Sequence, residues 1–307
     1  MSIEYAIIVR GRTRLEKLIE KYNTKAQAKF YIERLGGNFK NYEIEHEIFY
    51  QSLESLQSQL STVMKYKIVS RQYIASFIFS AQNVIIVIGQ DGLVANTAKY
   101  AKGVPIIAVN PDKSRYDGVL LPFDTSNFLP ATQKVLDNQY QSNNMYFAEA
   151  LLNDGQRLLA FNDLFIGASS HVSARYRISH NKQKESHSSS GIIVSTQAGS
   201  TGWLSSIFNM AYGVTGMFEK KLKLKHPTIK EHDLVFAVRE PFKSVSSQIG
   251  ISAGRIRNHK KLIIESQMPA NGIIFSDGVE KDFLQFNSGS IVTIGISKER
   301  ASLVIAE

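Results

Sequence analysis

Short apolar runs alternate with helical patterns through the first half of the chain. Strands are expected where β-branched runs end near Gly or Asn, at 3–10, 67–70, 83–89 and 105–110. Helices are expected where apolar residues recur at helical spacing, at 14–22, 25–37, 49–63 and about 129–140. This alternation is typical of a parallel sheet covered by helices, in which ligands bind beyond the carboxyl ends of the strands. The loops after Ile88 and Val109 are therefore the first places to look for a site.

After residue 145 the pattern changes to strands separated by turn signals. Asn153-Asp154-Gly155 lies between two apolar runs and predicts a hairpin. Further strands are expected at 175–180, 191–196, 233–238, 261–266, 272–276 and 290–297. A single helix, beginning near Thr201, interrupts them. The pattern therefore predicts a β-rich second half.

The predicted architecture is a Rossmann-like α/β domain at 1–140 followed by a β-rich, β-sandwich-like domain at 141–297. A C-terminal segment, 298–307, is expected to pack back on the first domain. No run approaches the roughly 20 apolar residues of a membrane span, and the first residues lack the pattern of a cleaved leader. We expect a globular protein that does not enter membranes.

The amino-acid composition limits the kinds of site and partner that the protein can have. The chain of 307 residues has no cysteine, which excludes disulfides, thiolate metal sites and thiol nucleophiles and favours a cytoplasmic location. Its net charge of +9 favours an anionic partner. The densest basic run, 219–227, alternates Lys with Leu and has no interleaved aromatic residues. We interpret it as a solvated edge strand or loop rather than a nucleic-acid site.

The first candidate site is the segment 84–100, an apolar strand that runs into GQDG and then a helical pattern. Gly89 and Gly92 permit a tight turn and close approach of the backbone to a ligand, and the helix start offers free N–H groups to phosphate. Asp91 could accept a proton from a hydroxyl nucleophile or help hold Mg²⁺. The alternative is a turn aspartate that caps the helix.

Three later segments carry further candidates. The first is 188–207, SSSGIIVSTQAGSTGWLSSI, which combines a strand end, a loop of small and hydroxyl residues and a helix start. This combination suits the binding of an anion or a ribose; the alternative is a plain helix cap. FNDLFIG, 161–167, contains the adjacent amide and carboxylate of Asn162 and Asp163, which suit a base or ribose edge, or a turn. FSDG, 275–278, predicts a hairpin corner.

Several common enzyme motifs are missing from the sequence. It has no GxGxxG after the first strand, no GxxxxGK[ST], no GxSxG and no HExxH. Dehydrogenases, P-loop ATPases, serine hydrolases and zinc proteases of the usual types are therefore not supported.

Together and in this order, the segments GQDG, VPIIAVN, FNDLFIG, SGIIVSTQAGSTGW and FSDG resemble the motifs of the NAD kinase family. The resemblance covers residues 83–297, and REPF at 239–242 is similar to the mitochondrial-type branch. It implies transfer of phosphate from ATP or polyphosphate, with Mg²⁺, to the 2′-hydroxyl of the adenosine ribose of NAD, bound between the two domains. By analogy the protein is a homo-oligomer.

The resemblance also implies roles for individual residues. Asp91 would be the general base or positioning carboxylate, and the phosphate loop would consist of Gly89, Gln90 and Gly92. The residues implied to bind NAD are Asn162, Asp163, Ser190, Ala198, Thr201, Gly202, Trp203, Ser206, Asp277 and Gly278.

The sequence departs from the family pattern at the phosphate loop. Gln90 stands where the family has a second glycine, and an L-residue resists a positive φ, so we expect a hindered loop there. Leu93 replaces a threonine of the family pattern. Ala198 stands at a Pro-Thr or hydroxyl position of the family's STPTGS motif, which reduces the contacts expected with NAD. These changes keep a second hypothesis open, a catalytically silent protein that binds NAD or another dinucleotide. A third hypothesis is a lipid or sugar kinase of the same superfamily, against which Asn162 and Asp163 argue.

Overall fold

The computed structural model describes residues 3–218 and 227–306. The chain forms two compact units: unit 1 is Met1–Asn144 with Ala301–Glu307, and unit 2 is Met145–Arg300. Most of the basic run at 219–227 lies outside the described residues, so its predicted conformation stays a prediction. No helix in the described part of the chain combines the length and apolarity needed to cross a bilayer.

Unit 1 is built on a parallel sheet, as the sequence predicts. Its order is β2 (Lys65–Ser70), β1 (Tyr5–Arg10), β3 (Asn83–Ile88) and β4 (Pro105–Val109). The β3 sequence, NVIIVI, is buried at every position, as expected for a central strand covered on both faces. The outer side of β4 pairs in parallel with the end of β16 (Ile291–Val304), where Ser302 lies opposite Pro105.

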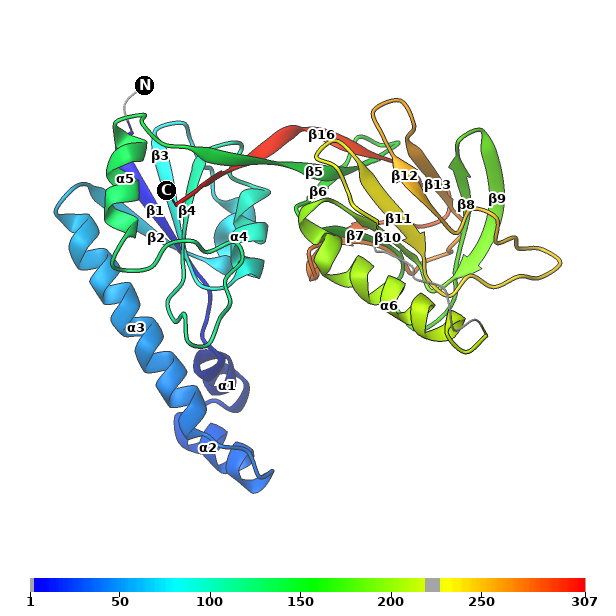
Figure 1. Cartoon of the computed structure of the whole chain (residues 1–307). Helices are drawn as coiled ribbons and strands as arrows, with labels where there is room; N and C mark the ends of the chain where they lie inside the picture. Colours follow the sequence, from blue (N-terminus) through cyan, green and yellow to red (C-terminus); the bar gives the residue numbers. More distant parts are fainter. Residues whose placement is uncertain (1–2, 219–226, 307) are drawn as a thin grey trace. The chain divides into compact units, whose positions relative to one another are not determined.

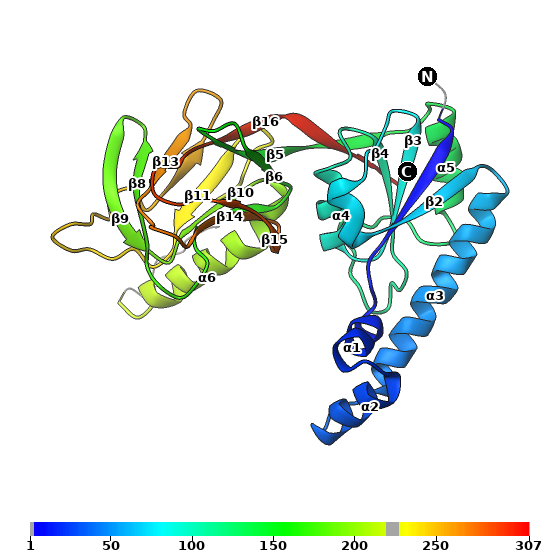
Figure 2. The same ribbon diagram turned by 180° about the vertical axis from the view of Figure 1, so that it is seen from behind.

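Helices cover both faces of this sheet. In Figures 1 and 2, α3 (Lys40–Ser61) and α5 (Phe128–Leu136) lie on one face and α4 (Asp91–Ala98) on the other. A core of α3 and sheet residues contains Phe49, Leu53, Leu56 and Leu60 from the helix. The helices α1 (Arg14–Tyr22) and α2 (Lys25–Arg34) lie beyond the carboxyl end of β1 and share a small core with Phe39.

Two predicted helix boundaries were wrong. The helix expected at 49–63 begins nine residues earlier, at Lys40, because polar residues of its first half face the α1 region instead of the sheet. Glu45 is an example: it is buried and ion-paired with Arg14. The helix expected to reach 140 ends at Leu136, and Asn138 has a left-handed φ of 54°.

Unit 2 is a sandwich of two mainly antiparallel sheets, which confirms the predicted β-rich fold. One sheet runs β12 (Ala253–Ile256), β11 (Leu234–Val238), β10 (Ile192–Ser195), β7 (Asp163–Ala168), β14 (Gly272–Ser276), β15 (Val279–Gln285). The other contains β16, β13 (Leu262–Ser266), β8 (Ala174–His180) and β9 (Gln183–Ser189), with β5 (Ser142–Leu152) and β6 (Arg157–Ala160) joined to it. Alternate strand residues face a shared apolar core that includes Phe236 and Tyr176.

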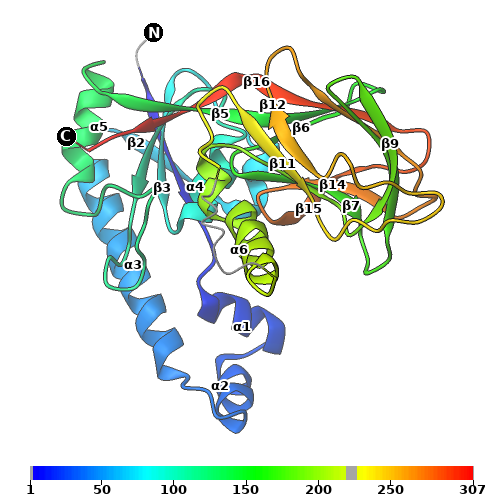
Figure 3. The ribbon, with the colours of Figure 1, turned by 45° about the vertical axis from the view of Figure 1, so that its right-hand side comes forward.

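The outer face of the six-stranded sheet carries α6 (Trp203–Thr215), as Figure 3 shows. Leu204 of this helix packs on Val235 and Ala237 of β11. The helix begins two residues after the expected Thr201, because Ala198–Thr201 forms a separate 3₁₀ turn.

The sequence reading missed four strands of unit 2. One is the central strand β7, whose residues were interpreted as a polar pair or a turn. The other three are β9, β12 and β15. Their sequences, QKESHSS, AGRI and VEKDFLQ, are polar or short. All three lie at sheet edges, where one side needs no pairing and little apolar surface is buried. Both predicted hairpins are present, since β5 pairs with β6 and β14 with β15 in antiparallel register.

Candidate functional site

The GQDG segment joins the end of β3 to the start of α4. Gln90 is the N-cap, and its φ of −118° and ψ of 163° are extended values that any residue adopts. The expectation that a non-glycine residue strains this loop was therefore wrong. The Gln90 side chain is exposed and is a hydrogen-bond partner of Tyr116, whose pKa is raised by burial and lowered by this contact.

Asp91 is the first residue of α4, and its carboxylate is held in place by the backbone. Its Oδ1 accepts a hydrogen bond from the N–H of Leu120 at 2.7 Å. The loop that supplies this N–H is organised by the buried Asn110, which accepts from the N–H of Asp112 and donates to the carbonyl of Tyr116. Asn110, at the end of the predicted strand, therefore stabilises the loop whose Leu120 N–H orients Asp91.

A cavity of about 320 Å³ opens at the carboxyl edge of the unit 1 sheet. Residues that follow three neighbouring strands line it: Gly11 after β1, Arg71 after β2 and Gly89 after β3. Gln90 and Gly92 also line it. This is the edge where the sequence places the first candidate site.

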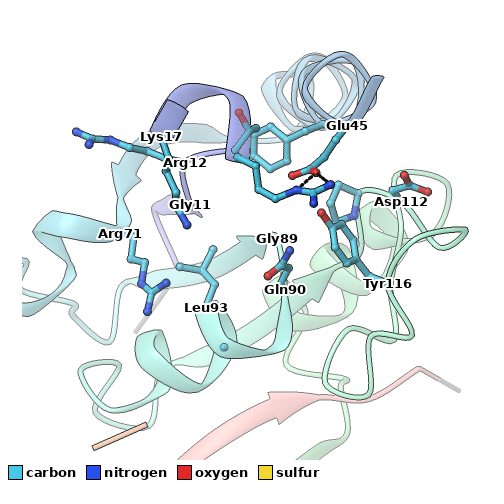
Figure 4. Close-up of a pocket in the computed structure, with 15 residues that line it drawn as sticks. Gly11, Arg12, Lys17, Glu45, Arg71, Gly89, Gln90, Leu93, Asp112 and Tyr116 are labelled. Atoms are coloured by element: carbon cyan, nitrogen blue, oxygen red, sulfur yellow. Dashed lines mark hydrogen bonds and ion pairs between the residues drawn. The ribbon is translucent and has the colours of Figure 1, made fainter. Parts of the chain in front are cut away.

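The charged side chains around this cavity are unevenly distributed. Figure 4 shows Arg12, Lys17 and Arg71 on one side and Glu45 with Asp112 on the other. The acidic side is neutralised within the protein. Glu45 pairs with Arg14 and with Arg115 at 3.6 Å, and Arg115 also reaches Asp112 at 3.4 Å. The basic side is therefore the one that attracts an anion.

In unit 2 a second group of predicted residues comes together around the β14–β15 turn. Asp277 and Gly278 are its central residues, with left-handed φ values of 53° and 68° that suit Asp and Gly. The Asp277 carboxylate accepts three backbone hydrogen bonds, from Phe161 at 3.0 Å, Asn162 at 2.6 Å and Asp163 at 3.2 Å. Two turns more than 110 residues apart are thereby locked to each other.

Asp163, the first residue of β7, carries a carboxyl group in an unfavourable environment. Burial raises its pKa to about 7; the Ser195 hydroxyl lowers it and the charge of Asp277 raises it. Its Oδ1 is buried without a hydrogen-bond partner among the described residues. Its Oδ2 lies toward Gly202, 3.9 Å from where a Cβ of that residue would be. An unsatisfied buried carboxyl costs stability and so points to a functional role.

The STQAGST loop closes over the Asn162 turn. The N–H of Thr196 donates to the carbonyl of Asn162 at 2.9 Å, and its hydroxyl donates to the carbonyl of Phe161 at 2.6 Å. Gly199 is required here, since a Cβ would lie 2.3 Å from the Asn162 carbonyl oxygen. Ala198 and Thr201 belong to the 3₁₀ turn, and Gly202 precedes the first residue of α6, whose cap has no side-chain hydrogen bond.

Aromatic side chains extend this region along the sheet face. Trp203 stacks on Phe165 at 5.8 Å between centroids, Phe275 stacks on Phe165 at 4.9 Å, and the Arg239 guanidinium lies 5.4 Å from the Trp203 ring centroid. These four residues and Ser190 line a cavity of about 890 Å³. Ser206, one turn further along α6, donates to the carbonyl of Gly202 at 3.5 Å.

The structure therefore brings three of the four predicted segments together in unit 2, through direct contacts of Asn162, Asp163, Gly199 and Asp277. The fourth, GQDG, lies in unit 1.

Sequence reasoning missed several residues of these regions, namely Lys17, Arg71, Tyr116, Phe165, Arg239 and Phe275. The sequence position of Arg71 could have indicated its place at the cavity, because Arg71 directly follows a strand of the parallel sheet, as Gly89 does.

Residues 3–218 and 227–306 contain no cluster of three or more His, Asp or Glu side chains that could hold a metal ion. Any Mg²⁺ ligand from this part of the chain would be an isolated side chain, of which Asp91 is the predicted one.

Comparison with known proteins identifies the fold. No family model and no curated protein matches the sequence. Among solved structures, the chain is similar to yeast NADH kinase complexed with NADH, with a TM-score of 0.59 and 11% identity, covering 100% of this chain and 84% of that one. It is also similar to an NAD kinase from Archaeoglobus fulgidus in complex with ATP, with a TM-score of 0.55 and 16% identity, covering 97% and 92%. The chain thus has the two-domain fold of the NAD kinases.

Proposed function

We propose that this protein is an NAD kinase-like phosphotransferase, which moves a phosphoryl group from ATP or polyphosphate to the 2′-hydroxyl of the adenosine ribose of NAD. The observation that carries the proposal is the group of contacts in unit 2 that joins Asn162, Asp163, the STQAGST loop and Asp277. These are the segments for which the sequence resembles the NAD-binding motifs. Two structures of the same fold hold NADH and ATP, which supports a dinucleotide and a phosphate donor as ligands.

The residues proposed to contact NAD belong to unit 2. The Asp163 carboxyl has one oxygen without a partner, and ribose hydroxyls of NAD would supply the missing donors. Thr201 and Gly202 place small side chains at the exposed start of α6, so the dinucleotide can lie against the backbone. Phe165, Trp203 and Arg239 supply the planar groups that line the neighbouring cavity, in which a base would stack.

The residues proposed to contact the phosphate donor lie at the start of α4, in unit 1. Apart from its chain neighbours and the backbone of its own helix, Gly92 has no protein atom within 4 Å of its ideal Cβ position, although glycine is less favourable than alanine in a helix. Since the protein itself does not need the space, a ligand that approaches the backbone accounts for the glycine. Gly89 and Gln90 complete this wall of the cavity.

The chemistry proposed is in-line transfer. The 2′-oxygen of NAD forms a bond to the terminal phosphorus while the bond from that phosphorus to the leaving phosphate oxygen breaks, and the 2′-hydroxyl proton passes to Asp91. Leu120 keeps the Asp91 carboxylate in one orientation for this step. Mg²⁺, when bound with the donor, neutralises charge on its phosphates. Only one Asp91 oxygen remains beyond the Leu120 contact, so this carboxylate would either accept the proton or contribute a single ligand to Mg²⁺, and in the step proposed here it accepts the proton.

The test is to incubate the purified protein with NAD, ATP and MgCl₂ and to measure NADP by chromatography. Asp91→Asn keeps the size of the side chain and its acceptor oxygen but removes the base, so turnover should fall by about 10²- to 10⁴-fold. Asp137→Asn, at an exposed helix end of the same unit, is the matched control and should leave turnover unchanged.

Two other results would contradict the proposal. NAD binding in calorimetry without any NADP formation would favour the catalytically silent dinucleotide-binding protein. Absence of both binding and turnover would favour the third hypothesis, a lipid or sugar kinase. The homo-oligomer, the cytoplasmic location and the likeness to the mitochondrial-type branch stay predictions; sedimentation of the purified protein tests the first.

A further inference from the structure

Asp163 and Asp277 are neighbouring carboxyl groups of unit 2 with opposite hydrogen bonding. Asp277 accepts three backbone N–H groups, which stabilise its negative charge. Asp163 has no such support: its Oδ1 is buried without a hydrogen-bond partner among the described residues. Two nearby carboxyl groups resist ionising together, and the one that lacks donors is the one that keeps a proton.

The hydroxyl of Ser195, which contacts the Asp163 carboxyl, is shared with a second acceptor. Its Oγ also lies 3.3 Å from the carbonyl oxygen of Thr196, to which it donates. A hydroxyl has a single proton, so it cannot donate to both acceptors at once. A protonated Asp163 satisfies both contacts, because its carboxyl O–H can donate to the Ser195 oxygen while Ser195 donates to Thr196. The hydrogen bonds of the free protein therefore suit the neutral acid.

The described surroundings of Asp163 contribute negative charge rather than positive. The STQAGST loop, 195–201, and the helix α6 contain no charged residue. Arg239, the cation over the aromatic stack, is paired with Glu240 at 3.7 Å. Among the described residues, the charge that acts on Asp163 is that of Asp277. Burial, with this charge added, raises the pKa of Asp163 to about 7, so the group holds its proton in mildly acidic solution.

We propose that Asp163 gives up its proton when NAD binds, so that each dinucleotide bound below neutral pH releases one proton to the solvent. The inference rests on the proposed function, in which ribose hydroxyls of NAD donate to Asp163. Those hydroxyls supply the donors that the free protein lacks, and hydrogen-bond donors favour the carboxylate over the acid. In the exchange, the O–H bond of the carboxyl group breaks, its proton passes to the buffer, and the carboxylate oxygens accept the ribose O–H groups.

The affinity for NAD should therefore depend on pH in one direction. Below pH 7 the free protein must lose a proton before it can make these contacts, so binding tightens as the pH rises. Above pH 7 the proton is already gone and the affinity levels off. Between pH 5.5 and pH 8.5 the dissociation constant of NAD should fall by about thirtyfold.

Calorimetry of the full chain with NAD alone measures the proton directly. Titrations at one pH in MES and in imidazole, two buffers of different ionisation enthalpy, give the number of protons released per NAD bound. We expect about 0.9 proton at pH 6 and less than about 0.1 at pH 8.5, the protonated fractions of a group with a pKa of about 7.

Three variants identify the source of the proton. Asp163→Asn has no proton to release, so its weaker NAD binding should not change with pH. Asp277→Asn removes the neighbouring charge, so the pH at which the affinity levels off should move downward, which a loss of structure alone would not cause. Asp137→Asn, at an exposed helix end, is the matched control and should behave as the wild type.

NAD binding that releases no proton at pH 6, or an Asp163→Asn variant that releases as many protons as the wild type, would overturn the inference. Either result leaves the proposed function standing if NADP is formed. Proton release that Asp163→Asn abolishes, without NADP formation from ATP, would refute the function and support the inference. Absence of NAD binding would overturn both.

Discussion

Replacing Asp163 by Asn removes a carboxyl group whose burial destabilises the fold. Folding raises its pKa from 3.8 to about 7. Well below pH 3.8 the group is neutral in both states, so the wild type and Asp163→Asn should have similar free energies of unfolding. As the pH rises from 4 to 7, the unfolded chain releases this proton while the folded chain keeps it, so the wild type loses stability. Above pH 7 the loss is complete.

The magnitude follows from the size of the shift. A change from 3.8 to about 7 is about 3 pKa units, or about 4 kcal/mol at about 1.4 kcal/mol per unit. The side chain is not fully shielded from solvent, so we expect Asp163→Asn to be about 2 to 4 kcal/mol more stable than wild type at pH 8. The same substitution should weaken NAD binding by about tenfold or more, since an amide replaces the carboxylate acceptor.

The assay uses the only tryptophan of the chain. Trp203 stacks on Phe165, two residues from Asp163 along β7, so its fluorescence reports unfolding of unit 2. Guanidinium unfolding of wild type and Asp163→Asn would be measured at pH 4.5, 6 and 8, with the exposed Asp137→Asn as control. A stability gap that does not widen with pH would refute the buried, protonated carboxyl and with it the reason for assigning Asp163 to ligand binding.

Three further predictions concern single residues. Gly92→Ala should raise helix stability by up to about 1 kcal/mol yet lower kcat/KM for the donor, whereas Gly213→Ala, at another open helical glycine, should give a similar stability gain with unchanged kinetics. Asp277→Ala leaves three backbone N–H groups without their acceptor, so guanidinium unfolding should show a loss of about 2 to 4 kcal/mol. Gln90→Gly relieves no backbone strain, so NADP formation should change less than about threefold; a larger rise would show that the side chain obstructs the donor.

Strand content and the parallel sheet were predictable because buried strands such as β3 are continuous apolar runs. The polar edge strand β9 was not, since neither alternation nor apolar composition marks it. Short sequence motifs were enough to predict individual residues of the unit 2 site. Their proximity depends on Asp277, whose hydrogen bonds join it to residues more than 110 positions earlier in the sequence. Local sequence contains no signal for such a contact.

The residues at the unit 1 cavity illustrate a second limit. Lys17 and Arg71 belong to segments of ordinary composition, and only the order of the strands brings them to one edge. The strain expected at Gln90 was wrong for a related reason. A sequence motif shows where the family has glycine but not which backbone angles this chain adopts there.

The pairing of β16 with β4 affects how the protein is synthesised. Unit 1 is discontinuous, since its first 144 residues are completed by residues from 301 onward. At translation rates of about 5 to 20 residues per second, the outer edge of β4 waits roughly 10 to 40 s for Ser302 and Leu303 to emerge. During that interval β4 offers unpaired backbone groups to other chains. This edge of the first unit is therefore open to pairing with other chains until residues 302 and 303 have been synthesised.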